Sequence, residues 1–386
     1  MAAFYYDIIC PYAYTAFMRL HRENIFVKKN IELKPILLGG LFKHMGQDPD
    51  LNSRLPKYKA DYIRQDIVRQ AQLYSVPLNF HPQHPVSSLK AMRLLHACEP
   101  RLREELSVIL YKAYWQEQQN LDDNDFIANL SQKFCCVSLE DAKMPLINAT
   151  AEAFSARVFG VPTLSINNRL YFGSDRLELI RKELDLKEIS YPWTPGKTLD
   201  FYFDFTSPYS YLAYQEVKKA LEEGVNINFK PILLGALFKE IGQAGVPMFS
   251  AHPHKAAYYL QDMQDWADAR ASSFIFNSNF PLKTVNALRA ALLEPSAIGP
   301  IFHAAWGENL NISDDQVLES VIDKAGLKGH EILVQCQSID IKEKLKNQTF
   351  EALSLGVFGV PFFSFDSQLI FGQDRIGWLK YELALK

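Results

Sequence analysis

The chain has 386 residues, enough for two domains that each bury a full hydrophobic core. Its apolar content of 48%, charged content of 22% and net charge of -3 are those of a globular protein without a basic field for nucleic acid or an anionic membrane surface. Asp7 interrupts the first apolar run, no positively charged segment precedes it, and no apolar segment approaches the ~20 residues that span a bilayer. We therefore expect a cytoplasmic protein with no nucleic-acid or membrane partner.

The first elements in chain order predict a βαβ unit. A β-rich run over residues 3–9 leads into a helix with apolar periodicity over residues 12–28, and a second strand follows over residues 31–37. Two strands joined by a crossover helix pair in parallel. The same order recurs over residues 199–205, 209–223 and 225–233.

A helical region and a closing unit come next in each half. Helical periodicity covers residues 58–74, 87–97, 102–118 and 124–134 in the first half, and residues 256–271, 284–293, 298–309 and 314–325 in the second. Each half then closes with a helix, a Val-Pro step, two short strands and a last helix. The expected strands cover residues 163–166, 169–172, 362–365 and 368–371, and the last helices begin at Asp175 and Asp374.

Three sequence matches in register indicate a tandem duplication. Lys34–Gln47 and Lys230–Gln243 are identical at eleven of fourteen positions, Val158–Pro162 matches Val357–Pro361, and Phe172–Arg176 matches Phe371–Arg375. A period near 197 residues has the size of a whole domain and is too long for a solenoid repeat. We place the two domains at residues 1–190 and 198–386, and the joint in Ser190–Lys197, where two prolines and a glycine stop regular structure.

The cysteines do not form a duplicated disulfide framework. They are five, Cys10, Cys98, Cys135, Cys136 and Cys336, and they do not recur at matching places in the two halves. Reduced thiols are expected. The adjacent Cys135 and Cys136 are either small core residues or a redox-active pair.

The element order resembles a thioredoxin fold interrupted by an all-helical insertion, at about residues 43–150 and 239–345. Four motifs occur in order in the second half: Asp-Phe-x-Ser-Pro-Tyr-Ser, Leu-Leu-Gly-Ala-Leu-Phe-Lys, Gly-Val-Phe-Gly-Val-Pro and Phe-Gly-x-Asp-Arg. They resemble the kappa-class glutathione transferase and 2-hydroxychromene-2-carboxylate isomerase family, within the DsbA-like superfamily. The resemblance implies an α/β fold class with two thioredoxin-like domains, glutathione as cofactor, and an intrachain pseudo-dimer of the two halves.

Ser207 precedes Pro208 at the start of the predicted helix of the second half. Taken alone, Ser followed by Pro is an ordinary helix start, in which the serine caps free backbone N–H groups. The same helix N-terminus also offers positive potential to an anion. The Ser207 hydroxyl is therefore a candidate donor to the thiolate of bound glutathione, and such a bond together with the helix dipole would lower a thiol pKa by about two units.

Cys10 stands where the second half has Ser207, 197 residues earlier. A thiol at a helix N-terminus is expected to have a lowered pKa. Position 13 is Ala, so the second sulfur that a Cys-x-x-Cys oxidoreductase needs is missing. Three interpretations stay open: Cys10 activates glutathione in place of serine, it forms a mixed disulfide with glutathione as a monothiol, or the site has decayed.

The Val-Pro steps, Val161-Pro162 and Val360-Pro361, are on their own compatible with a turn or an edge strand. The family resemblance implies a cis bond at each, which leaves the valine backbone to pair with an extended, peptide-like ligand such as glutathione.

A last set of residues is predicted to contact the ends of glutathione. Ser174 or Gln373 would hold the γ-glutamyl carboxylate at a helix start, while Asp175 or Asp374 would face its ammonium. A cap with a structural Asp-Arg pair is the alternative, and Gln373 is longer than the small polar residue expected from the family. The predicted substrate-binding residues are Lys43, Lys239, Tyr12 and Tyr209. The histidines do not align as a metal set between the halves, so no metal site is expected.

Together these observations predict a glutathione-dependent isomerase or transferase. Ser207 would activate the glutathione thiolate, with Cys10 as a second catalytic candidate, and the substrate would be a small electrophile such as an aromatic carboxylate. One alternative is a monothiol DsbA-like thiol-disulfide oxidoreductase acting through Cys10. A second is a non-catalytic N-terminal half that serves as an interaction module.

Overall fold

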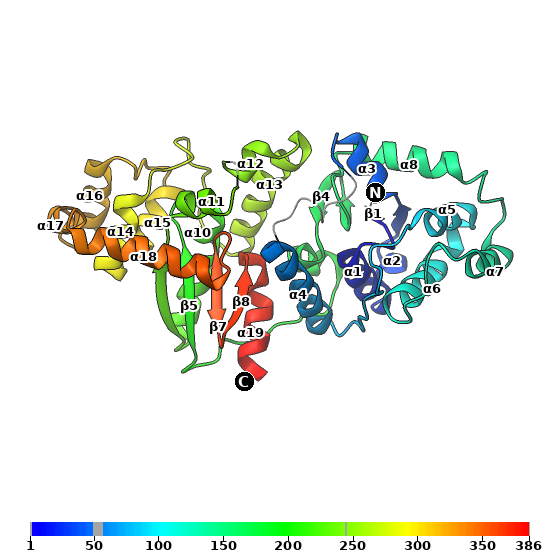
Figure 1. The fold of residues 1–386 in the computed structure, drawn as a ribbon, viewed down its shortest axis with the longest axis horizontal. Helices are drawn as coiled ribbons and strands as arrows, with labels where there is room; N and C mark the ends of the chain where they lie inside the picture. The colour runs from blue at the N-terminus through cyan, green and yellow to red at the C-terminus, as the bar shows by residue number, and fades with distance from the viewer. Residues whose placement is uncertain (1, 49–56, 244, 386) are drawn as a thin grey trace. The chain divides into compact units, whose positions relative to one another are not determined.

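The computed structural model describes residues 2–48, 57–243 and 245–385. It separates into two compact units, unit 1 ending at Ile189 and unit 2 beginning at Ser190 (Figure 1). Residues 49–56 of the first predicted insertion and residue 244 of the second lie outside the described residues. No helix in the described ranges is long and apolar enough to cross a membrane.

Unit 1 is built on a mixed four-stranded sheet of order β2-β1-β3-β4. Its strands are β1 (Ala2–Tyr6), β2 (Ile31–Pro35), β3 (Thr163–Ile166) and β4 (Arg169–Phe172). β1 pairs in parallel with β2 and antiparallel with β3, and β3 pairs antiparallel with β4. The predicted βαβ start and the two closing strands are thus joined in one sheet, with β1 at its centre.

The helices of unit 1 follow the predicted order. They are α1 (Pro11–Arg22), α2 (Ile25–Lys28), α3 (Leu38–His44), α4 (Lys57–Leu73), α5 (Leu89–Ala97), α6 (Arg103–Trp115), α7 (Asn124–Phe134), α8 (Lys143–Ser155) and α9 (Arg181–Leu184). The single helix predicted over residues 12–28 is wrong, because Asn24 adopts a left-handed conformation (φ 58°) between α1 and α2.

Unit 2 repeats this sheet in the order β6-β5-β7-β8. The strands are β5 (Thr198–Phe203), β6 (Asn226–Pro231), β7 (Phe362–Phe365) and β8 (Gln368–Phe371). In Figure 1, β5, β7 and β8 run side by side, as their pairing requires. The helices are α10 (Pro208–Glu222), α11 (Leu234–Glu240), α12 (Pro247–Ser250), α13 (Pro253–Ala269), α14 (Val285–Leu293), α15 (Ile298–Trp306), α16 (Asp315–Lys324), α17 (Gly329–Gln335), α18 (Ile339–Leu355) and α19 (Ile376–Leu385).

The last helix of each half does not begin at the predicted aspartate. A 3₁₀ turn comes first, over Ser174–Glu178 in unit 1 and Gln373–Arg375 in unit 2. In unit 2 the long helix α19 then starts at Ile376, whereas unit 1 has only the short α9. The glycine before each turn has a positive φ, 107° for Gly173 and 105° for Gly372, and an added Cβ would lie 2.6 or 2.5 Å from the following aspartate's Oδ1. Only glycine fits at these two positions.

Aromatic side chains fill the core of each unit. In unit 2, Phe201 and Phe203 of β5 stack at 5.3 Å between ring centroids, and Phe203 contacts Phe302 of α15 at 5.5 Å. In unit 1, Tyr6 of β1 contacts Tyr111 of α6 at 6.2 Å between ring centroids. The helical insertion therefore packs on the central strand of each unit, close in sequence to Ser207 or Cys10.

Candidate active site

Ser207 is the N-cap of α10, as its sequence context predicts. Its Oγ accepts a hydrogen bond from the Ser210 N–H at 3.1 Å, and its hydroxyl donates to the Val360 carbonyl at 3.4 Å. Ser207 as a whole is 6% exposed. The cap uses the oxygen as an acceptor and leaves the hydroxyl proton on a long bond, so the proton can be redirected without loss of the cap.

The Val-Pro steps lie directly beside these caps. Val161-Pro162 and Val360-Pro361 are both cis, as the family resemblance implies. The proline carbonyls accept from Gly173 N–H at 2.9 Å and Gly372 N–H at 3.0 Å. Each cis step is therefore tied to the turn that follows the last strand, and three separate sequence motifs meet at one end of the sheet.

Cys10 occupies the same position in unit 1 but in a different state. It is the N-cap of α1 without a side-chain capping bond, and its Sγ donates to the Val161 carbonyl at 3.1 Å. Burial raises the pKa of the Cys10 thiol to about 12, and the nearby charge of Asp7 adds to this effect. The expected lowering of its pKa is therefore wrong. The backbone N–H groups of Tyr12 and Ala13 favour the thiolate, but the loss of solvation outweighs them.

A buried aspartate holds the loop in front of each cap. In unit 2, Asp204 Oδ2 accepts from Leu234 N–H at 2.9 Å, while Oδ1 accepts from Thr206 N–H at 3.0 Å and from the Thr284 hydroxyl at 2.6 Å. Burial raises the pKa of its carboxyl, and these hydrogen bonds oppose the rise. Asp204 thus joins the end of β5 to the start of α11 and to the helical insertion.

Asp7 makes the corresponding bonds in unit 1, to Leu38 N–H at 2.9 Å and Ile9 N–H at 3.2 Å. Burial raises its pKa as well. A tryptophan adds a second tie in each unit. Trp306 Nε1 donates to the Phe205 carbonyl and Trp115 Nε1 to the Ile8 carbonyl, both at 2.8 Å.

The turn before α19 places Gln373 in the interior of unit 2. Gln373 is 2% exposed, and neither its amide nitrogen nor its amide oxygen has a hydrogen-bond partner among the described residues. Its backbone carbonyl accepts from Arg270 at 3.0 Å. A buried, unpaired amide is costly, so this one is a candidate ligand group.

The neighbouring Asp-Arg pairs are formed in both units. Arg176 Nη1 lies 2.7 Å from Asp175 Oδ2, and Arg375 Nη1 lies 3.2 Å from Asp374 Oδ1. Ser174 is buried at the position of Gln373. The arginines therefore contact the aspartates, the arrangement expected if they orient them.

The predicted substrate-binding residues fall into two groups. The Tyr12 hydroxyl donates to Asp66 at 2.7 Å, and the Tyr209 hydroxyl donates to Asp262 at 3.2 Å. Each tyrosine thus ties the start of the capped helix to α4 or α13 of the insertion. Lys43 and Lys239, by contrast, are exposed near the ends of α3 and α11.

Sequence reasoning missed several supporting residues. Asp7 and Asp204 are 197 residues apart, the same spacing as Cys10 and Ser207, so comparison of the two halves could have found them. Trp115 and Trp306 are 191 residues apart. A fixed period does not align these tryptophans, because the chain between the cap and the tryptophan has a different length in each half.

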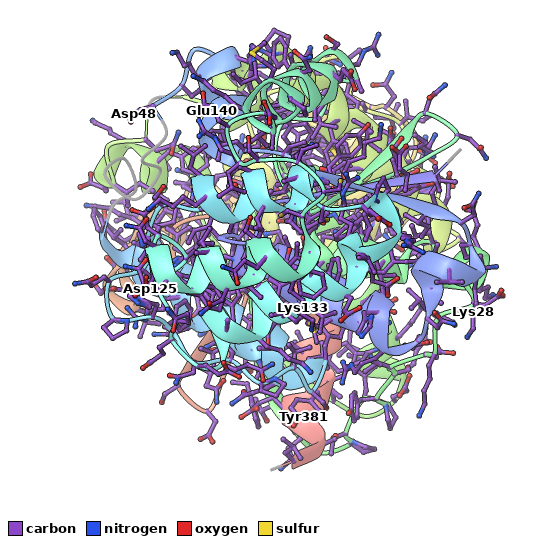
Figure 2. The ribbon with its side chains drawn as sticks, turned by 90° about the vertical axis from the view of Figure 1, so that its right-hand side faces the viewer. Lys28, Asp48, Asp125, Lys133, Glu140 and Tyr381 are labelled. Carbon is purple, nitrogen blue, oxygen red and sulfur yellow. The ribbon has the colours of Figure 1, made fainter. Side chains whose placement is uncertain are left out.

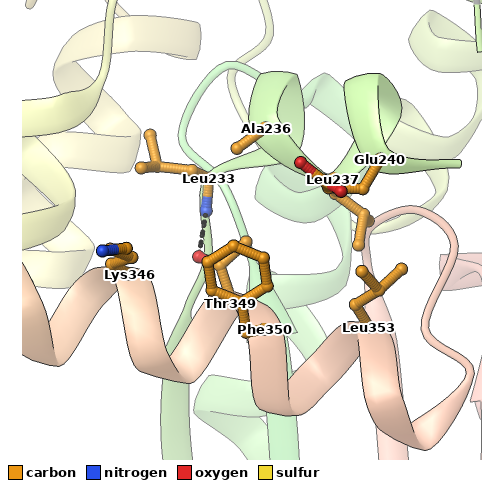
Figure 3. Close-up of a pocket in the computed structure, with 8 residues that line it drawn as sticks. All are labelled: Leu233, Ala236, Leu237, Glu240, Lys346, Thr349, Phe350 and Leu353. Carbon is orange, nitrogen blue, oxygen red and sulfur yellow. Dashed lines mark hydrogen bonds between the residues drawn. The ribbon is translucent and has the colours of Figure 1, made fainter. Parts of the chain in front are cut away.

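A small apolar cavity lies between α11 and α18, next to this region but not in it. It has a volume of about 70 Å³ and is lined mainly by aliphatic and aromatic side chains (Figure 3). At its edge the Leu233 N–H donates to Thr349 Oγ1 at 3.1 Å, the dashed line in Figure 3. Thr349 thus holds the loop before α11, whose next residue, Leu234, donates its N–H to Asp204.

A cis-proline step beside the capped helix of a mixed four-stranded sheet defines a thioredoxin-like protein. The chain matches the DSBA-like thioredoxin domain over residues 2–185 and again over residues 198–384. It therefore belongs to this family and carries its domain twice.

Two curated relatives each match about half of this chain. The 2-hydroxychromene-2-carboxylate isomerase of Pseudomonas putida is 29% identical over 187 residues, which are 47% of this chain and 92% of the relative. Glutathione S-transferase kappa 1 of Rattus norvegicus is 28% identical over 199 residues, 46% of this chain and 87% of the relative. A solved structure of 2-hydroxychromene-2-carboxylate isomerase matches with a TM-score of 0.45 at 26% identity, over 49% of this chain and 95% of that chain. The relatives confirm the resemblance predicted from the motifs.

Proposed function

We propose that unit 2 is a glutathione-dependent isomerase or transferase centre in which Ser207 holds the glutathione sulfur as thiolate. The observation that carries this proposal is the position of the Ser207 hydroxyl, at the N-terminus of the 15-residue helix α10 and 3.4 Å from the carbonyl of a cis-proline step. The names of the relatives, an isomerase and a glutathione transferase, support the same reaction classes.

The role of Ser207 follows from hydrogen bonding and the helix dipole. A charge-assisted hydrogen bond contributes about 1.5–3 kcal/mol and a helix N-terminus about 0.3–1 kcal/mol in favour of the anion. A thiol with a pKa of about 8.5 is roughly 3% ionised at pH 7, and a lowering by about two units raises this to roughly 75%. When bound, glutathione would supply a nucleophilic sulfur that adds to an electrophilic carbon, giving a conjugate or, after departure, an isomerised product.

The unpaired polar groups inside unit 2 support a site for the γ-glutamyl end of glutathione. The Gln373 amide presents one donor side and one acceptor side without partners in the described structure, and Asp374 lies next to it. An α-amino acid group carries a carboxylate that accepts and an ammonium that donates. In this proposal Gln373 and Asp374 hold that group, while the backbone of Val360 pairs with the extended peptide part of the ligand.

Tyr209 and Lys239 are proposed to face the second substrate, a small electrophile such as an aromatic carboxylate. Tyr209 is held by Asp262, so its ring position is fixed at the start of α10. Lys239 is exposed and can approach an anionic group from solvent. Lys43, Tyr12, Ser174 and Asp175 would be the corresponding groups of unit 1.

The capped helix start of unit 1 is proposed not to carry thiol chemistry. Cys10 is 8% exposed, donates to Val161 and has a pKa raised to about 12, all of which oppose formation of a thiolate. These observations favour the N-terminal half as a non-catalytic module over a monothiol oxidoreductase. We further propose that the two halves, as two copies of one domain, form an intrachain pseudo-dimer in the cytoplasm.

The proposal is tested by turnover with glutathione and the substrate of the isomerase relatives, 2-hydroxychromene-2-carboxylate, together with a general aromatic electrophile. We expect Ser207→Ala to lower kcat by about 10- to 100-fold, the range of one charge-assisted hydrogen bond. Ser210→Ala is the matched control, because it removes a buried hydroxyl from the same helical turn but keeps the backbone N–H that bonds to Ser207. Equal activity of Ser207→Ala and wild type would overturn the assignment.

A further inference from the structure

Three of the five cysteines gather at one place in the insertion of unit 1, away from the candidate active site. Cys98 follows the end of α5, and Cys135 and Cys136 follow the end of α7. Their thiols all point at the last carbonyls of α5: Cys98 at Leu95 O (3.3 Å), Cys135 at Leu94 O (3.8 Å) and Cys136 at Ala97 O (3.2 Å). Figure 2 shows Asp125 and Lys133, two exposed residues of the same α7.

Cys98 and Cys135 face each other across an isolated antiparallel bridge. The hydrogen bond of this bridge joins the neighbouring residues: the Cys136 N–H donates to the Ala97 carbonyl at 3.0 Å. The N–H groups of Cys98 and Cys135 themselves donate to carbonyls within α5 and α7. The two cysteines are therefore a non-hydrogen-bonded pair. In such a pair the Cα atoms lie about 4.5 Å apart with the side chains on one face, within the ~4.4–6.8 Å that a disulfide requires.

From this register we propose that Cys98 and Cys135 form a reversible disulfide by exchange with a low-molecular-weight disulfide such as glutathione disulfide. Cys98 is buried, Cys135 is half-buried and Cys136 is exposed. Cys135 is thus the member of the pair that an oxidant reaches, and Cys98 is placed to resolve the adduct. This inference does not rest on the proposed function of unit 2.

The exchange proceeds in two balanced steps. The Cys135 thiol loses its proton to solvent and its sulfur attacks the small disulfide, whose S–S bond breaks to release one glutathione thiolate. The Cys98 thiol then loses its proton and attacks Cys135 Sγ, which releases the second glutathione. The two protein thiols are oxidised by two electrons, and the small disulfide is reduced to two thiols. Burial raises the pKa of Cys98 to about 11, so the second step is slow at neutral pH.

The counterpart position in unit 2 has no such pair. The residue after α14, which corresponds to α5, is Glu294. The cysteine of unit 2, Cys336, is buried and donates to the Asn286 carbonyl at 3.6 Å. It serves as an internal control for oxidation of the folded chain.

Mass spectrometry of the full chain after equilibration with glutathione disulfide tests the proposal. Acid stops the exchange, the chain is denatured, its free thiols are alkylated with a maleimide near neutral pH, and it is digested with trypsin without reduction. We expect a cross-link between the peptides Leu94–Arg101 and Phe134–Lys143, lighter by two hydrogen atoms than their sum with Cys136 alkylated, and reversed by dithiothreitol. Cys136→Ser should keep the cross-link. Cys98→Ala should lose it and leave Cys135 carrying glutathione.

Several results would overturn the proposal. One is that Cys98 and Cys135 stay alkylatable in the wild-type chain after equilibration, which needs no variant and so does not depend on how a variant folds. Others are a bond that joins Cys135 to Cys136, or a cross-link lost in Cys136→Ser. A cross-link that appears only together with modification of Cys336 would belong to an unfolded chain, and it would also count against the pair.

Discussion

Ser207 and Cys10 share a place in the fold and a similar burial, but their side chains make different hydrogen bonds. The serine oxygen accepts the capping N–H of Ser210 and still has a proton to donate, whereas the Cys10 side chain makes no capping bond. Sulfur is a weak acceptor, so a buried thiol turns its proton to the nearest carbonyl, here Val161. The replacement of the serine oxygen by a cysteine sulfur thus changes a candidate anion-binding hydroxyl into a buried neutral thiol.

The state of Cys10 predicts a slow reaction with alkylating agents. With a pKa of about 12, only about one thiol in ten thousand is ionised at pH 8. We expect iodoacetamide to modify Cys10 far more slowly than the exposed Cys136 in the native chain, a difference that peptide mass spectrometry follows over time. Equal rates at the two positions would mean that Cys10 is reactive, and the monothiol interpretation would return.

Gln373 predicts a loss of glutathione affinity on substitution. Gln373→Leu removes both polar groups that are proposed to hold the γ-glutamyl end, so we expect Kd to rise about tenfold, or about 1.4 kcal/mol. The same change also removes an unpaired buried amide, and the ligand-free protein should become no less stable.

Calorimetric titration with glutathione measures the change in Kd. Ser174→Ala, at the matching position of unit 1, is the control and should leave the unit 2 affinity unchanged. An unaltered Kd in Gln373→Leu would remove this residue from the proposed site.

At the scale of elements, the loop between β5 and α10 is set by tertiary bonds rather than by its own sequence. Asp204 accepts the Leu234 N–H at the start of α11 and the Thr284 hydroxyl before α14. Helix α11 was not predicted, and neither was α3, because a tertiary aspartate satisfies the N-terminal N–H of each helix and no local capping residue marks it. Local signals did predict α10, whose cap lies in its own sequence.

Replacement of Asp204 should have a pH-dependent cost. A carboxyl whose pKa is raised by folding stabilises the fold below its unfolded pKa of about 4, and this stability is lost as the pH rises through the folded pKa. Asp204→Asn has no titrating carboxyl, and it also replaces one of the two acceptor oxygens with an amide NH2 group, at a cost of about 1–3 kcal/mol. The variant should therefore have a lower free energy of unfolding than wild type, and the difference between the two should be larger near pH 4 than at pH 7.

Urea unfolding followed by tryptophan fluorescence checks this difference, since four of the five tryptophans lie in unit 2. A difference in free energy of unfolding that increases from pH 4 to pH 7 would contradict the raised pKa of Asp204.

At the scale of the whole molecule, the duplicated fold could be predicted from the sequence because the motifs recur near a fixed period. The strands and the two caps follow from matched segments, whereas the cis bonds at Val161-Pro162 and Val360-Pro361 were implied by the family resemblance. The burial of Cys10 could not be predicted in this way. Burial depends on the side chains packed around the cap, and these come from helices distant in the sequence, which no local motif indicates.

The two units thus share the same sheet and cis-proline step, but they differ at the start of the capped helix. In unit 2 a hydroxyl lies at the cap and an unpaired amide lies inside the closing turn. In unit 1 the cap is a protonated thiol, and a separate group of three cysteines lies in the insertion. We therefore propose that glutathione is activated in unit 2 alone.

The most direct measurement is an ultraviolet titration of the thiolate of glutathione bound to the full chain, with the absorbance of the protein alone subtracted. We expect an apparent pKa about two units below the ~8.5 of a free thiol in wild type and in Ser210→Ala, and a return toward ~8.5 in Ser207→Ala. Cys10→Ala should titrate as wild type does. Identical titrations of wild type and Ser207→Ala would contradict the central role of Ser207.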